Sequence, residues 1–313
     1  MRYFFLLYSF CLITTIANSQ TGKTAVFAKE ISFTTENDAY LFKAGDAYYT
    51  NGFFMALRTA REKKGKKLVQ AYELGQMIYT PLIRKTTGPE DIDRPYCGYL
   101  YLHYTQTQFY HKSVLQYSGG VGEVGTDSFG ENVQNSYHKL LGYSRFSGWQ
   151  YQVQNALGID MGISYAHTLF EDSSWIKLMP VVQANLGSTF TNAKLGAYLC
   201  LGSFENNTNS ALWNARVQTK NTETRKNHEL FLYWYPQLIL QGYNATVQGG
   251  LFRKGTGAVL KDLQNLMFQQ SFGLCYAEGK WTTNFAIVYQ TKEAVTQKRP
   301  QEYGSLLVSY RLH

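Results

Sequence analysis

Hydrophobic and polar side chains alternate over many segments of the chain. In segments 158–169 and 268–277, large apolar or aromatic side chains recur at every second position, with small or polar side chains between them. Successive residues of a strand point to opposite faces of a sheet, so each segment has one apolar and one polar face. Soluble sandwiches also alternate, but these segments reach the roughly 9–11 residues that a tilted strand needs to cross a membrane. The pattern therefore favours a transmembrane β-barrel.

Twelve segments fit this pattern and are predicted as strands. They cover 26–36, 49–59, 69–80, 98–110, 113–123, 157–168, 175–187, 190–203, 229–241, 266–277, 281–291 and 302–312. An even number suits a closed barrel with both termini on the periplasmic side. The predicted fold class is all-β, a closed antiparallel transmembrane β-barrel of about 12 strands. The polar segment 204–228, rich in Asn and Thr, is expected to be a mobile loop.

The N-terminal end has the features of a secretory signal peptide. Arg2 precedes an apolar run over 3–16, which ends at the small-x-small sequence Ala17-Asn18-Ser19. Such a run is too short to span a bilayer as a helix, which needs about 20 apolar residues. We therefore expect a signal peptide over 1–19, followed by one outer-membrane barrel domain over 20–313.

Charge and cysteine content narrow the class of partner. The formal net charge is +8, but the basic residues are scattered, and the one dense cluster, 61–67, lies in a predicted turn. In an exported protein this favours anionic lipid or lipopolysaccharide phosphates over nucleic acid, which we do not expect as a partner. Cys97, Cys200 and Cys275 are odd in number and lack CxxC spacing, so free thiols are expected.

Unusual residues concentrate in three loops that follow odd-numbered strands and so point out of the cell. These loops, taken as 37–50, 81–97 and 124–156, come from consecutive hairpins and are expected to meet on one side of the barrel rim. Within the third loop, apolar residues recur at helical spacing, which predicts a short extracellular helix over 131–141. Gly142 suits the C′ position of that helix.

The motifs in these loops occur in a fixed order. The first is END…YTNG (from Glu36 and Tyr49), the second GQxxYTP…DRPYxGxLY, and the third VQNxxHxLLG…GW. Together, over residues 30–155, they resemble the LpxR family of outer-membrane lipid A 3′-O-deacylases. The resemblance implies a twelve-stranded barrel, lipid A or lipopolysaccharide as substrate, and calcium as cofactor. We expect a monomer in the bacterial outer membrane.

The resemblance also implies site residues. His138 would be the general base that deprotonates a water for attack on an ester carbonyl, a task suited to an imidazole. Asn37, Asp38 and Thr50 match the family's catalytic and calcium-binding positions, and calcium prefers such oxygen ligands. Gln134 lies four residues before His138 and shares its helix face, and we expect it to bind substrate beside the histidine.

Other positions near the motifs remain open to more than one interpretation. Arg84 and Lys85 lie near a basic position of the family's second loop and would contact a substrate phosphate. Where the family has an acidic residue six positions after the histidine, this chain has Ser144. The task of orienting the imidazole would then pass to Glu131, Asp127 or Gln134, or activity would be weakened.

Structural interpretations stand beside the functional ones. Asp93 and Arg94 are expected to form an ion pair that pins a loop, Trp149 to anchor the barrel at the membrane interface, and His103 to face the lumen. Two other functions also stay open. One is a barrel phospholipase acting on glycerophospholipids, and the other is a non-catalytic structural or small-solute barrel.

Overall fold

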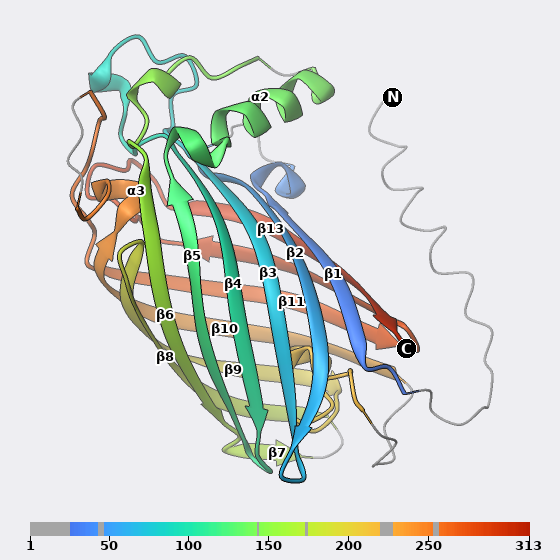
Figure 1. Ribbon diagram of the computed structural model, residues 1–313. Helices are drawn as coiled ribbons and strands as arrows, with labels where there is room; N and C mark the ends of the chain where they lie inside the picture. The colour runs from blue at the N-terminus through green and yellow to red at the C-terminus, as the bar shows by residue number, and fades with distance from the viewer. Residues whose placement is uncertain (1–25, 43–46, 143, 173–174, 220–227, 253–256) are drawn as a thin grey trace.

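The computed structural model describes residues 26–42, 47–142, 144–172, 175–219, 228–252 and 257–313 (Figure 1). The predicted signal peptide, 1–19, lies outside the described residues. Among the described residues, no helix has the length and apolar character to cross a membrane.

Twelve long strands close into an antiparallel barrel, as predicted. They are β1 (Lys29–Asn37), β2 (Tyr48–Lys63), β3 (Lys66–Thr80), β4 (Cys97–Phe109), β5 (Ser113–Val124), β6 (Ala156–His167), β8 (Ile176–Gly187), β9 (Phe190–Ser203), β10 (His228–Asn244), β11 (Leu266–Glu278), β12 (Trp281–Gln290) and β13 (Gln301–Leu312). Pairing of β1 with β13, and of β6 with β8, completes the ring. The short β7 (Phe170–Asp172) follows β6 and pairs with the next part of β8, over Ile176–Leu178. It was not predicted, because three residues are too few to show alternation.

The two ends of the barrel differ. At one end, here called the helix end, lie α2 (Gly130–Leu141), α3 (Ala245–Gln248) and the short 3-10 helices η2 (Asp38–Leu41), η3 (Pro89–Asp91), η4 (Thr126–Ser128) and η5 (Trp149–Tyr151) (Figure 1). The predicted helix is confirmed, and Gly142 caps it with a φ of 76°. At the other end, the terminus end, β1 begins and β13 finishes.

The outer wall is apolar and the lumen is polar. On β1, Ile31 and Phe33 are each 47% exposed. Glu30 and Ser32, which alternate with them along the strand, are buried in the lumen. The same alternation runs along the other strands, so exposed apolar side chains form a continuous lipid-facing surface.

Segment 204–218 fills the lumen at the terminus end. It contains η6 (Ala211–Trp213), and Trp213, Ala215 and Val217 pack against buried residues of the wall. The expectation that 204–228 is a mobile loop is therefore wrong for these residues. Apolar side chains spaced through a polar segment give it an inner face that the barrel buries.

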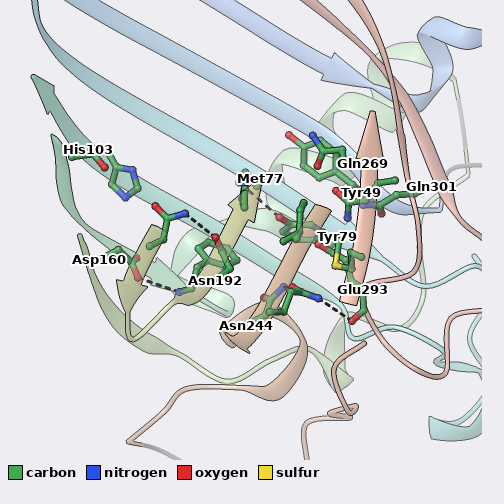
Figure 2. A pocket seen from close by; sticks show the side chains of 18 of the residues that line it. Tyr49, Met77, Tyr79, His103, Asp160, Asn192, Asn244, Gln269, Glu293 and Gln301 are labelled. Atoms are coloured by element: carbon green, nitrogen blue, oxygen red, sulfur yellow. Dashed lines mark hydrogen bonds between the residues drawn. The ribbon is translucent and has the colours of Figure 1, made fainter. Parts of the chain in front are cut away.

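The helix-end half of the lumen holds a cavity of about 370 Å³ (Figure 2). Tyrosines, amides and the charged side chains of Asp160, Lys194 and Glu293 line it, and His103 faces it as predicted. Arg94 is fully buried beside this cavity. It stacks on the ring of Tyr79 at 3.8 Å and forms an ion pair with Glu293 at 2.8 Å. The predicted loop pin at Arg94 thus exists, but its acidic partner is Glu293.

Candidate functional site

The predicted site residues gather on the outer wall of the barrel, at the helix end. Asn37 stands on the same face of β1 as the lipid-facing Ile31 and Phe33, yet only 2% of it is exposed. Its cross-strand partner on β2 is Asn51, which is 1% exposed. Two buried amides therefore interrupt an apolar, lipid-facing surface.

A β-bulge at Thr50 brings Asn51 to the outer wall. The register between β2 and β3 shifts between Tyr49 and Asn51. Residues two apart normally share a face of a strand, but Tyr49 lines the lumen cavity while Asn51 hydrogen-bonds outside the barrel. The extra residue, Thr50, turns the chain between these two directions.

Helix α2 covers this part of the wall. Its first residue, Gly130, abuts Gly98 at the start of β4, and a Cβ added at Gly98 would lie 2.7 Å from the Gly130 Cα. Further along α2, the Tyr137 ring meets the Phe53 ring of β2 edge-on at 6.3 Å. Because neither glycine has a side chain, the two backbones come into contact, and the helix packs directly on the barrel wall.

A chain of hydrogen bonds links the helix to the barrel. The Asn37 amide donates to Asn51 Oδ1, and Asn51 Nδ2 donates to Gln134 Oε1 at 2.5 Å. Gln134 Nε2 lies 2.9 Å from His138 Nε2, and the Ala39 N–H donates to Asn37 Oδ1 at 2.7 Å. Gln134 and His138 are both buried, so the predicted shared face of the helix points at the wall.

The backbone of Ser144 orients the imidazole. His138 Nδ1 lies 2.7 Å from the Ser144 carbonyl oxygen, which can only accept, so Nδ1 carries the proton. With the proton on Nδ1, Nε2 can accept, and Gln134 donates to it. Of the three groups considered for the orienting role, Gln134 takes part, Asp127 is exposed, and Glu131 lies in the first turn of α2, about two turns before His138. The backbone at position 144 orients the ring although its side chain is not acidic.

Arg84 and His138 lie against the same aromatic ring, that of Phe146. The Phe146 ring is 5.5 Å from the His138 ring, and the Arg84 guanidinium stands 5.3 Å from the centre of the same Phe146 ring. Lys85 is exposed. A cation therefore stands one aromatic ring away from the imidazole.

Asn37, Asp38 and Thr50 are all buried and offer only oxygen ligands. Asp38 Oδ2 accepts from the Ala47 N–H at 3.0 Å, and the Thr50 hydroxyl donates to the Ile78 carbonyl at 3.3 Å, which leaves its lone pairs available. Amide, carboxylate and hydroxyl oxygens suit a hard cation such as calcium. Across the described ranges, no group of three or more His, Cys, Asp or Glu is arranged to hold a metal. Any calcium would thus rely on one carboxylate and neutral oxygens.

An aromatic cluster supports the far side of the site. Trp149 is 2% exposed and packs with Ile78, Tyr96 and Phe146. The prediction that Trp149 anchors the barrel at the membrane interface is therefore wrong, because the outward loops fold back over it. Burial raises the pKa of Tyr96 to about 12, so its hydroxyl, 2.8 Å from Thr86 Oγ1, stays neutral.

The sequence analysis assigned no role to Asn51 or to the Ser144 carbonyl. A signal for Asn51 existed, since it precedes Phe53, Met55 and Leu57 on the apolar face of its strand. A polar residue at a lipid-facing position near a strand end marks such a site. The role of the Ser144 carbonyl could not be predicted, because every residue has a backbone carbonyl and the pattern of side chains does not show which one is used.

Contact between Gly98 and Gly130 predicts a sensitive position. Replacing Gly98 with alanine should push α2 off the wall and cost about 1–3 kcal/mol of stability, because the added Cβ meets the buried Ser128 hydroxyl and the backbone of Gly130. Limited proteolysis should then cleave α2 faster while the barrel remains folded. Gly119→Ala is the matched control, since the nearest atom to its added Cβ is 3.7 Å away. Equal cleavage of both variants would contradict the prediction.

Fold and site together define a bacterial outer-membrane β-barrel with a buried polar site on its lipid-facing wall. A family model described as outer membrane protein LpxR matches residues 5–312. The chain therefore belongs to the LpxR family.

Solved structures agree at the level of the fold. LpxR from Salmonella typhimurium superposes with a TM-score of 0.75 at 18% identity, covering 90% of this chain and 100% of that one. The β domain of the Bordetella autotransporter BrkA gives a TM-score of 0.48 at 10% identity, with 92% of this chain and 99% of that one covered. No curated protein matches the chain in sequence.

Proposed function

We propose that this protein is a hydrolase that removes an ester-linked acyl chain, the 3′-O chain, from lipid A in the outer leaflet. The observation that carries the proposal is the buried polar chain from Asn37 to His138 on the lipid-facing wall. A base in this position meets a lipid ester directly from the membrane, without passage through the lumen. Membership of the LpxR family supports the same activity.

His138 Nε2 is the nitrogen that accepts the proton from water. Gln134 donates to that nitrogen at 2.9 Å, so its amide has to withdraw before a water can take its place. The Ser144 carbonyl keeps the bond to Nδ1 and stabilises the imidazolium that forms. Arg84 and the exposed Lys85 stand where a lipid A phosphate would approach, and each supplies a positive charge.

Asn37, Asp38 and Thr50 would hold calcium. When bound, calcium would polarise the ester carbonyl and stabilise the negative charge that develops on its oxygen. With a single carboxylate, the expected affinity is weak, on the order of 10⁻⁴–10⁻³ M.

Asp38→Asn tests the calcium site without relying on activity. Millimolar calcium should raise the melting temperature of the wild type, because a ligand that binds only the folded state stabilises it. The variant, with its carboxylate replaced, should lose this shift and also its deacylation. Asp127→Asn, which removes an exposed carboxylate on a neighbouring loop, should behave as the wild type. An unchanged calcium shift in Asp38→Asn would rule out this ligand.

The test of the reaction itself is mass spectrometry. Purified protein is incubated with lipid A and, separately, with glycerophospholipids, with calcium supplied. The proposal expects loss of one acyl chain from lipid A and intact phospholipids. Cleaved phospholipids with intact lipid A would instead identify a phospholipase, and no cleavage of either would leave a non-catalytic barrel.

A further inference from the structure

A third buried amide, beside those of Asn37 and Asn51, lies on the lipid-facing wall near α2. Along the outer face of β3, exposure falls from 57% at Tyr72 and 50% at Leu74 to 9% at Gln76 and 0% at Ile78. Helix α2 contacts both β3 and β4, and it covers the strand where the exposure falls. Gln76 therefore lies at the edge of the covered region, between the buried site and the part of the wall that is exposed to lipid.

The amide of Gln76 is not satisfied within the protein. Within the part of the chain that the structure describes, its Nε2 is buried and has no hydrogen-bond partner. A buried donor without a partner is costly, most of all next to lipid, where no water replaces the missing bond. Such a group calls for an explanation beyond the protein's own contacts, and a bound ligand that accepts its hydrogen bond supplies one.

Register places Gln76 next to the hydrogen-bonded chain. Asn51 pairs with Ile78, and Phe53 pairs with Gln76. Gln76 is thus the diagonal neighbour of Asn51 on the same face, about 7–8 Å away, on the side toward the membrane centre. An acyl chain whose ester meets His138 would run down the wall past Gln76.

We propose that Gln76 binds the acyl chain of the substrate, its Nε2 donating to an oxygen on the chain a few bonds from the ester. The acyl chains attached directly to the sugars of lipid A carry an oxygen substituent at carbon 3, whereas those of ordinary glycerophospholipids carry none. Gln76 is thereby a specificity-determining residue for oxygen-substituted chains. The inference rests on the proposed function, since it assumes that the scissile ester lies at His138.

The test compares two lipid A substrates, one with the carbon 3 oxygen on the scissile chain and one without it. The kcat/KM of the wild type should be about tenfold higher for the first substrate than for the second. This ratio corresponds to about 1.4 kcal/mol of differential binding. Gln76→Leu should lose this preference, mainly through a higher KM. Gln70→Leu is the matched control and should keep it. Gln70 lies on the same face of β3, nearer the terminus end, and its Nε2 already donates to the Tyr104 hydroxyl at 2.8 Å.

Binding measured without turnover separates this inference from the hydrolase proposal. If wild type binds the oxygen-substituted lipid more tightly than Gln76→Leu does, but cleaves neither substrate, the role of Gln76 stands and the hydrolase proposal falls. If Gln76→Leu retains both the preference and the affinity of the wild type, the inference is overturned. Because leucine suits a lipid-facing wall, the variant is expected to fold, which thermal unfolding will check.

Discussion

Replacing His138 with alanine should lower the rate of lipid A deacylation by about 10²–10⁴-fold, the usual contribution of a positioned general base. The imidazole is 1% exposed and is bonded through both ring nitrogens, so its position is fixed before substrate arrives. Substrate affinity should change little, because the ring acts on water. Single-turnover rates from lipid A mass spectra, together with a separate binding measurement, would check both parts of the expectation.

His111 provides the control, since it is an exposed histidine in the turn between β4 and β5 at the opposite end of the barrel. His111→Ala should retain wild-type rates. A His138→Gln variant preserves most of the side-chain volume and can still donate to the Ser144 carbonyl, but it cannot accept a proton. It should be as inactive as the alanine variant. Full activity in His138→Gln would show that a different group serves as the base.

The strands were predicted accurately because a barrel exposes one face to lipid and the other to a polar lumen. In β3 the alternation places Tyr72 and Leu74 outside and Glu73 and Gly75 inside, as the structure has it. Closure of the ring followed from the even number of strands. Only β7 was not predicted, because its three residues are too few to show alternation.

The site was predicted only in part. His138 and Gln134 were placed on one face of a helix by their spacing, and the structure turns that face to the wall. The link to Asn37 runs through Asn51, whose direction depends on the bulge at Thr50. A bulge is set by how two strands pair, so the alternation within a single strand cannot reveal it.

Segment 204–218 shows a different limit. Its composition is that of an exposed loop, and besides its apolar packing it is held by one acid of the wall, Glu229, at the start of β10. The carboxylate of Glu229 accepts from the backbone N–H groups of Glu205 and Ala211, each at 2.8 Å, and from the Ser210 hydroxyl at 3.0 Å. It also pairs with Arg216 at 2.8 Å. The sequence of 204–218 alone does not indicate these bonds, because their acceptor, Glu229, belongs to β10 of the barrel wall.

Glu229→Ala should therefore release this segment from the lumen. The change leaves Arg216, which is 1% exposed, as a buried charge without its carboxylate, and breaking a buried pair in this way costs about 3–5 kcal/mol. Three further hydrogen bonds to the segment are lost at the same time. In planar bilayers the wild type should conduct few ions, since 204–218 fills the lumen, whereas Glu229→Ala should open stable channels. Protease added from the terminus end should cleave the segment in the variant alone.

Two comparisons make this result specific to the buried pair. Glu62→Ala removes an exposed acid near the same end of the barrel and should stay closed. The double replacement Glu229→Leu with Arg216→Met removes both charges, so no uncompensated charge remains, and it should conduct less than Glu229→Ala. A closed, protease-resistant Glu229→Ala barrel would mean that apolar packing of Trp213, Ala215 and Val217 alone holds the segment in place. Deacylation should survive in every one of these variants, because the His138 site lies on the outer wall at the other end of the barrel.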